Sequence, residues 1–296
     1  MSESFSQFQE SLGNLSPAAQ GSGVELLLCL VEPETAMLLR LCAIPHEFSP
    51  NILTILSPGL EASTADERYE KLVSFPFVSV GNYEATMHDQ VRRELFAHWL
   101  REENRGRFAA VSLSLSQYFE ELMPSALSWV REQLVRKRIF HLIGADLLKG
   151  FEEFERLCRQ GRYQYRFSDC HALIRLVHEY DSILSGDLRS RLTYHEGKLA
   201  ADLRQWERAE ELFMQIVEDG SVTPELKSKA FFRLGTISAD QGQNRMAIAQ
   251  YEEALPLAER HPEGNGQVYR ILGALGTAYR EESQFERAQE LLENSL

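Results

Sequence analysis

The chain of 296 residues has few cysteines, a deficit of basic residues and no long apolar run. Its four cysteines include no CxxC pair, so neither a zinc ribbon nor a disulfide framework is expected, and buried thiols fit a reducing cytoplasm. No apolar run reaches the roughly 18 residues that a membrane-spanning helix needs. Residues 1–23 lack the basic and apolar regions of a signal peptide, and their Ser, Gln and Gly content predicts a disordered tail.

Basic residues are outnumbered, with 31 Lys+Arg against 44 Asp+Glu and a net charge of −13. Binding to nucleic acid phosphates needs clustered Lys and Arg, so nucleic acid is not the expected partner. The short basic run at residues 136–138 is interpreted as a solvated helix face. These features predict a cytoplasmic protein that does not bind membranes.

Motifs of the common enzyme classes are missing as well. There is no GxSxG, no HExxH and no GxxxxGK[ST] loop, and residues 144–150 have two glycines without the required lysine and Ser or Thr. The histidines are too widely spread to indicate a metal site. The sequence therefore predicts a protein that is not an enzyme and holds no metal or cofactor of its own.

The last third of the chain repeats one pattern three times. In each copy an alanine follows a glycine by twelve residues, and a bulky apolar residue follows four later: Gly197, Ala209, Phe213; Gly235, Ala247, Tyr251; Gly276, Ala288, Leu292. A glycine inside a helix costs up to about 1 kcal/mol, so its recurrence indicates that two helices approach closely there. We expect the first helix to cross the second at Gly and Ala, with the bulky residue filling the layer to the next pair.

This pattern resembles the tetratricopeptide repeat (TPR), whose unit is about 34 residues. The resemblance implies a right-handed α-solenoid over residues 186–296 in an all-α protein. The copies here are longer, so extra residues are expected in the helices or in the connections 217–227 and 260–267. Pro224 and Pro262 match the family's proline loosely. Ala172, which lies 37 residues before Ala209, predicts a degenerate first repeat within a helical linker over residues 106–185.

The N-terminal part reads as helices followed by a small β-hairpin. Glu32-Pro33 divides a helical region at residues 24–46, and Ser49-Pro50 opens the next helix. Thr64 and Glu67 fit a capping box that opens a helix ending at residue 73. Residues 77–87 then predict a hairpin with a two-residue turn at Gly81-Asn82, before a helix at residues 88–101. This order resembles a winged-helix domain over residues 24–105.

The triplet Met87-His88-Asp89 lies between the hairpin and that helix and resembles the MHD motif of the STAND class of signalling ATPases, which includes NB-ARC and NLR-type switches. The resemblance implies that His88 lies near the β-phosphate of ADP and that Asp89 caps the helix, where the dipole favours both roles. This chain has no phosphate-binding loop, so ADP or ATP is expected only if a nucleotide-binding domain lies upstream of this chain. The alternative is that this domain has been lost. In the alternative interpretation the two residues merely cap a helix.

Basic residues recur on the first helices of the repeats. In TPR folds the second residue of the first helix faces the concave surface, which gives Arg191, Lys229 and Arg270 here, with Lys198 and Arg233 one turn on. Such a ladder would attract a carboxylate or an acidic peptide. Lys198 and Arg233 stand where the clamp asparagines of chaperone-binding TPRs would be, so a chaperone-tail clamp is not expected. The alternative is that these are ordinary solvated charges paired with Glu and Asp.

The favoured function is the sensor and protein-interaction part of a STAND-type regulator, docked on an upstream nucleotide-binding domain. The alternatives are a free-standing TPR adaptor and, more weakly, a winged-helix DNA-binding regulator, against which the acidic sequence of residues 66–71 argues. Phe285, Leu291 and Leu292 are expected to face a following element, which predicts a truncated chain or self-association through this uncapped end.

Overall fold

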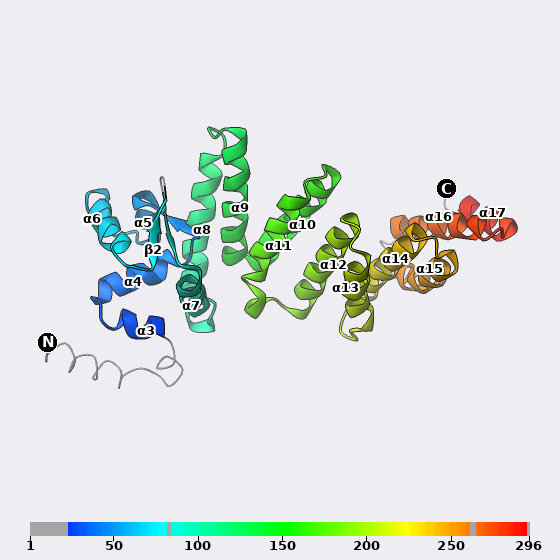
Figure 1. The fold of residues 1–296 in the computed structure, drawn as a ribbon, viewed down its shortest axis with the longest axis horizontal. Coiled ribbons are helices and arrows are strands. Elements are labelled where there is room, and N and C mark those ends of the chain that lie inside the picture. The colour runs from blue at the N-terminus through cyan, green and yellow to red at the C-terminus, as the bar shows by residue number, and fades with distance from the viewer. Residues whose placement is uncertain (1–22, 82–83, 261–264, 295–296) are drawn as a thin grey trace. The chain divides into compact units, whose positions relative to one another are not determined.

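The computed structural model describes residues 23–81, 84–260 and 265–294 (Figure 1). It divides into two compact units, Met1–Glu153 and Phe154–Leu296. Both are built mainly of helices, and a small three-stranded sheet lies in the first. The predicted disordered tail falls outside the described residues except for Gly23. None of the helices in the described ranges is long and apolar enough to cross a membrane.

The first unit begins with α3 (Gly23–Leu28) and α4 (Pro33–Cys42), with Pro33 in the first turn as predicted. The elements that follow are β1 (Glu47–Phe48), α5 (Pro50–Leu56), α6 (Ala62–Val73), β2 (Val78–Val80), β3 (Ala85–Met87) and α7 (Asp89–Trp99). The strands form an antiparallel sheet in the order β1-β3-β2. This is the element order predicted for a winged helix, with the two-residue strand β1 as an addition that the sequence did not indicate.

Local signals predicted some of these boundaries and missed others. Ser49 caps α5, because its hydroxyl accepts a hydrogen bond from the Ile52 N–H. The predicted capping box is wrong: α6 begins earlier, and the Thr64 hydroxyl donates to the carbonyl of Glu61 at 2.9 Å. The Gly81 N–H donates to the Glu84 carbonyl at 2.9 Å, so Gly81 pairs across the hairpin. Asn82, the other residue of the predicted turn, lies outside the described residues.

The helices η1 (Glu102–Asn104), α8 (Arg105–Leu122) and α9 (Ser128–Ala145) complete the first unit. Phe140 of α9 packs against Phe96 of α7, with ring centroids 5.6 Å apart. Lys137 forms ion pairs with Glu47 at 2.7 Å and Glu84 at 2.6 Å, which join α9 to the sheet. Arg138 likewise pairs with Glu120 at 3.2 Å and with Glu153 at 3.5 Å. The interpretation of residues 136–138 as a solvated face is therefore wrong for Lys137 and Arg138.

The described part of the second unit contains four helical hairpins and the short 3-10 helix η2 (Asp181–Ile183). The hairpins are α10 (Leu147–Tyr163) with α11 (Phe167–His178), α12 (Gly186–Asp202) with α13 (Trp206–Glu218), α14 (Pro224–Asp240) with α15 (Asn244–Glu259), and α16 (Asn265–Glu281) with α17 (Phe285–Asn294); the first turns of α10 belong to the first unit. The first helix of each hairpin has 17 residues, so helix length accounts for much of the extra repeat length. Pro224 opens α14, and Pro262 lies outside the described residues.

The glycine positions are points of close helix contact, as predicted. A Cβ added to Gly197 would lie 2.8 Å from the Phe213 ring, and one added to Gly235 would lie 2.4 Å from the Tyr251 ring. The bulky residue therefore packs on the glycine of its own hairpin, and Phe213 also belongs to the hydrophobic cluster shared with α14. Leu292 packs on Gly276 in the same way.

Leu291, the second residue predicted to face a following element, packs on the hydrophobic cluster of α14–α16. Phe285, the third, is 65% exposed. Both leucines are half-buried within their own unit, and Phe285 is the most exposed of the three. That this end of the chain faces a following element or self-associates stays a prediction.

The turn inside each hairpin has one common geometry. In the last three hairpins the residue seven positions after the repeat glycine has a positive φ: Arg204 (58°), Gly242 (75°) and Ser283 (61°). Tyr165 (55°) is the corresponding residue in the turn between α10 and α11. The N–H of the next residue donates to a carbonyl five positions back, as in the Schellman motif. This register identifies α10–α11 as the first repeat, with Cys158 and Cys170 at the glycine and alanine positions. The repeat predicted around Ala172 is present, but its register was wrong by two residues.

Candidate functional site: a basic groove in the second unit

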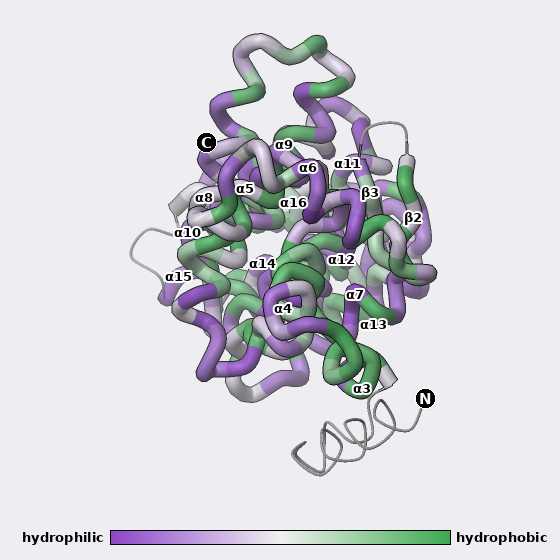
Figure 2. The backbone as a smooth tube through the Cα atoms, turned by 90° about the vertical axis from the view of Figure 1, so that its left-hand side faces the viewer, coloured by the Kyte–Doolittle hydropathy of each residue, from purple (hydrophilic) through white to green (hydrophobic). Residues whose placement is uncertain are grey.

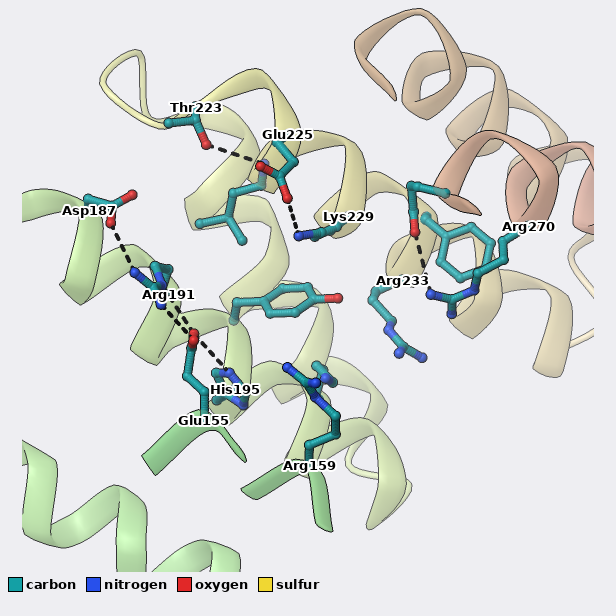
Figure 3. A pocket seen from close by; sticks show the side chains of 15 residues that line it. Glu155, Arg159, Asp187, Arg191, His195, Thr223, Glu225, Lys229, Arg233 and Arg270 are labelled. Carbon is teal, nitrogen blue, oxygen red and sulfur yellow. Dashed lines mark hydrogen bonds and ion pairs between the residues drawn. The ribbon is translucent and has the colours of Figure 1, made fainter. Parts of the chain in front are cut away.

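A cavity of about 490 Å³ runs along the first helices of the four hairpins (Figure 3). All five cations predicted from the sequence line it: Arg191, Lys198, Lys229, Arg233 and Arg270. Glu155 and Arg159 of α10 also contribute, together with Tyr194 and His195 of α12 and Phe232 of α14. The structure therefore brings the predicted residues together at one surface, which we call the basic groove.

Helical spacing explains why these side chains share a surface. Arg191, His195 and Lys198 of α12 are separated by four and three residues, and Lys229 and Arg233 of α14 by four, so each set lies on one helix face. The first helices begin earlier than expected, which makes Arg191 the sixth residue of α12 rather than the second. Counting back from the repeat glycines therefore identified the residues that face the groove, but the predicted start of the first helices was wrong.

Two of the predicted cations have carboxylate partners. Arg191 pairs with Glu155 at 2.6 Å and with Asp187 at 3.6 Å, and Lys229 pairs with Glu225. Burial raises the pKa of Glu155, but hydrogen bonds from His195 and Arg191 outweigh it and hold the pKa at about 2. Glu155 is therefore ionised at neutral pH. For Arg191 and Lys229 the alternative interpretation, of charges paired with nearby acids, describes the contacts correctly.

The other three predicted cations, Lys198, Arg233 and Arg270, have aromatic neighbours. The Lys198 Nζ lies 5.2 Å from the ring centroid of Tyr194, and the Arg270 guanidinium lies 5.0 Å from that of Phe232. Within the described ranges no carboxylate forms an ion pair with Arg159, Lys198, Arg233 or Arg270. The groove thus carries uncompensated positive charge in a chain whose net charge is −13.

The surroundings of Lys198 disfavour its charged form. Burial, followed by the positive charges of Arg162, Arg233 and Arg159, lowers its pKa to about 7. An ammonium group beside three guanidinium groups is electrostatically unfavourable, and a bound anion would relieve that cost. The groove is therefore suited to receiving negative charge from outside the chain.

A second cavity of about 690 Å³ continues the first. The two share Arg159, Lys198, Arg233 and Arg270, and the second adds Arg162, Tyr163, Tyr165, Phe167 and Asp202. Arg162 is neutralised by a two-point contact with Asp202, one distance being 2.8 Å. Tyr163 and Tyr165 are 82% and 81% exposed. The repeat pattern in the sequence does not mark Arg159, because cysteines occupy the small-residue positions of its repeat.

His88 and Asp89 belong to the first unit and are both exposed. His88 is the N-cap residue of α7, and its side chain makes no capping hydrogen bond. Asp89 follows in the first turn, where the helix dipole stabilises its negative charge. The His88 side chain borders a smaller, largely apolar cavity of about 300 Å³ with Val24 and Leu27 of α3, a helix coloured as hydrophobic in Figure 2. The nucleotide-sensing role of both residues stays a prediction.

In the described part of the chain, no group of three or more His, Cys, Asp or Glu side chains is arranged so that it could hold a metal ion. His178 does have carboxylate neighbours that sequence analysis missed, since its ring nitrogens contact Asp181 at 3.0 Å and Glu196. Burial lowers the pKa of His178, but the hydrogen bonds to these two carboxylates outweigh it and raise the pKa above its ordinary value.

No family model matches the chain, and no curated protein matches it. Among solved structures, MamA protein is 13% identical over 64% of this chain and 91% of its own, with a TM-score of 0.43. BtubC from P. vanneervenii is 16% identical over 79% and 87%, with a TM-score of 0.46. A signal transduction ATPase with numerous domains (STAND) and a tetratricopeptide repeat sensor, from Pyrococcus horikoshii, is 14% identical over 99% of this chain and 59% of its own, with a TM-score of 0.29.

These likenesses are too weak to carry an argument about function. The assignment of the second unit to a TPR-like helical-repeat fold rests on its own geometry. That geometry consists of four hairpins with one turn type and, in the last three, a glycine packed under the bulky residue of the partner helix.

Proposed function

We propose that the second unit is a protein-interaction module that binds an acidic segment of a partner in the basic groove. The observation that carries the proposal is a set of four cations on the first helices of four successive hairpins, none of which pairs with a carboxylate among the residues that the structure describes. Complementary charge speeds encounter and selects acidic partners. A groove spanning several hairpins suits an extended segment, because each hairpin offers contacts to a different part of it.

We further propose that the first unit is a winged-helix module that docks on a nucleotide-binding domain of the STAND type outside this chain. The element order, the sheet order β1-β3-β2 and the exposed position of His88 at the start of α7 support this. On this proposal the chain alone binds ADP weakly or not at all, since it has no phosphate-binding loop. Calorimetry of the chain with ADP tests it, and micromolar affinity would contradict it.

A free-standing adaptor is the second candidate function. It is favoured by the location of the basic groove, whose lining residues all belong to the second unit. DNA binding by the first unit has less support, because the cations of α6 that would meet phosphates are already paired: Arg68 with Glu34 at 2.8 Å and Lys71 with Glu32 at 2.5 Å.

The interaction function can be tested with fluorescently labelled oligoglutamate and fluorescence anisotropy. The test variant reverses two groove charges, Arg233→Glu with Arg270→Glu. The matched control, Arg208→Glu with Arg245→Glu, makes the same charge change at exposed positions of α13 and α15 that line neither cavity. We expect the groove variant to lose affinity at least about tenfold, which is about 1.4 kcal/mol, and the control to change little. Equal losses in both variants would show that net charge, not the groove, attracts the peptide.

A further inference from the structure

Four consecutive repeats each place one cation at the region where the two cavities overlap. Arg159 comes from α10, Lys198 from α12, Arg233 from α14 and Arg270 from α16. In Figure 3 the labelled arginines Arg159, Arg233 and Arg270 reach into the groove from three different helices. The overlap region is therefore a convergence of positive charge from the whole second unit rather than a feature of one helix.

Hydrogen-bond donors at this region also lack acceptors. The Nε of Arg233 and the side-chain amide nitrogen of Gln267 are buried and have no acceptor among the described residues. The Oε1 of Gln267 accepts a weak hydrogen bond from Arg270 at 3.4 Å, which leaves the amide N–H groups to donate elsewhere. Buried donors in folded proteins are normally paired, so these two donors have hydrogen-bonding capacity that the described residues do not use.

The number of cations and donors distinguishes between possible anions. A carboxylate brings one negative charge and two oxygens, whereas a phosphate monoester brings a charge of about −1.5 to −2 at pH 7 and three acceptor oxygens. Guanidinium groups bind phosphate through two parallel hydrogen bonds, and three of the four cations are arginines. The dianion with more acceptors therefore fits the region better than a single acidic side chain.

We propose that the overlap of the two cavities binds the phosphate group of a phosphorylated side chain in the partner segment, with Arg159, Lys198, Arg233 and Arg270 around it. This inference rests on the proposed interaction function and names the chemistry of its central contact. A side chain carried by a protein segment is favoured over a free organic phosphate because the first cavity continues past the cation cluster toward Arg191 and Lys229, where further residues of a segment would lie.

The test uses the full chain and short labelled peptides that differ only at a central position, which is phosphoserine, glutamate or serine, in otherwise glutamate-containing sequences. We expect the phosphoserine peptide to bind at least about tenfold more tightly than the glutamate peptide at the same ionic strength. The variants Arg233→Gln and Lys198→Met should remove that preference. The matched control Arg208→Gln should keep it, because Arg208 lines neither cavity.

The outcomes separate this inference from the function on which it rests. Equal binding of the phosphoserine and glutamate peptides, both weakened by Arg233→Gln, would overturn the phosphate site and leave the acidic-segment function standing. Binding of none of the peptides would contradict both. Competition by free phosphoserine at the concentration of the phosphopeptide itself would show that the groove binds a small organic phosphate, and would overturn the choice of a protein segment. Circular dichroism of each variant separates lost binding from lost folding.

Discussion

Replacing Gly235 by alanine tests the helix contact on which the repeat fold depends. The added Cβ would lie 2.4 Å and 2.5 Å from the Cε1 and Cδ1 atoms of Tyr251, closer than real Cβ contacts come. Tyr251 is 3% exposed and packed in the α14–α16 cluster, so its ring cannot swing away cheaply. Alanine gains about 1 kcal/mol of helix propensity over glycine, while overpacking costs about 1–3 kcal/mol. We expect a net destabilisation of about 1 kcal/mol.

The matched control is Gly186→Ala in the first turn of α12, where no atom lies within 4 Å of the added Cβ. That variant should be neutral or more stable than wild type, since it gains propensity without a clash. Urea unfolding followed by circular dichroism measures both, and the midpoint of Gly235→Ala should lie below that of wild type. A Gly235→Ala protein as stable as wild type would refute the reasoning that close packing, and not chance, keeps glycine at this register.

Three further predictions concern charge and turn geometry. Lys198→Met should be more stable than wild type at pH 7, and this difference in stability should shrink toward pH 9. The pKa of lysine is about 10.4 in the unfolded chain, whereas the pKa of Lys198 in the folded protein is about 7, so the stability of the wild type rises between these two pH values. A pH-independent difference in urea midpoints would contradict this. Arg204→Gly should stabilise the folded protein by about 1 kcal/mol in thermal unfolding, because the φ of Arg204 is 58°, and Gly242→Ala should destabilise it, because the φ of Gly242 is 75°. A destabilised Arg204→Gly and a stabilised Gly242→Ala would count against the Schellman turns. Burial lowers the pKa of His178, but Glu196 and Asp181 raise it by more, so NMR should find a pKa above 6.5. The stability that His178 contributes should be fully present below pH 6.5 and lost as the pH rises through the pKa of the folded protein. A pKa at or below 6.5 would show that the pairs with Glu196 and Asp181 do not form in solution.

The repeats could be predicted because the small and bulky residues that touch across a hairpin recur at fixed spacing. Gly197, Gly235 and Gly276 set the register from which the groove cations were counted, so those cations were found together. The first hairpin was misaligned because Cys158 and Cys170 replace glycine and alanine there, and thiols give no such signal. Arg159 was missed for that reason, although it occupies the same register as Lys198.

Other features depend on contacts that no local pattern encodes. Pro33 marks a helix start through its ring-restricted backbone and Ser49 through its capping hydroxyl, so the sequence alone located both starts. The role of Lys137 depends on Glu47 and Glu84, which lie far away in the chain and meet it only in the folded unit. The positive φ of Arg204 was not predicted, because glycine is the usual residue at that position and arginine carries no turn signal.

The most direct test of the central claim is to map where an acidic peptide contacts the chain. Oligoglutamate that carries a photoreactive benzophenone is crosslinked to the full chain, and the attachment sites are identified by mass spectrometry with and without excess unlabelled peptide. The account predicts that competed crosslinks fall on the groove-lining segments of α10, α12, α14 and α16, and that Arg233→Glu with Arg270→Glu removes them. Competed crosslinks that concentrate outside those helices, or that persist in this double variant, would contradict the assignment of the groove as the partner-binding site.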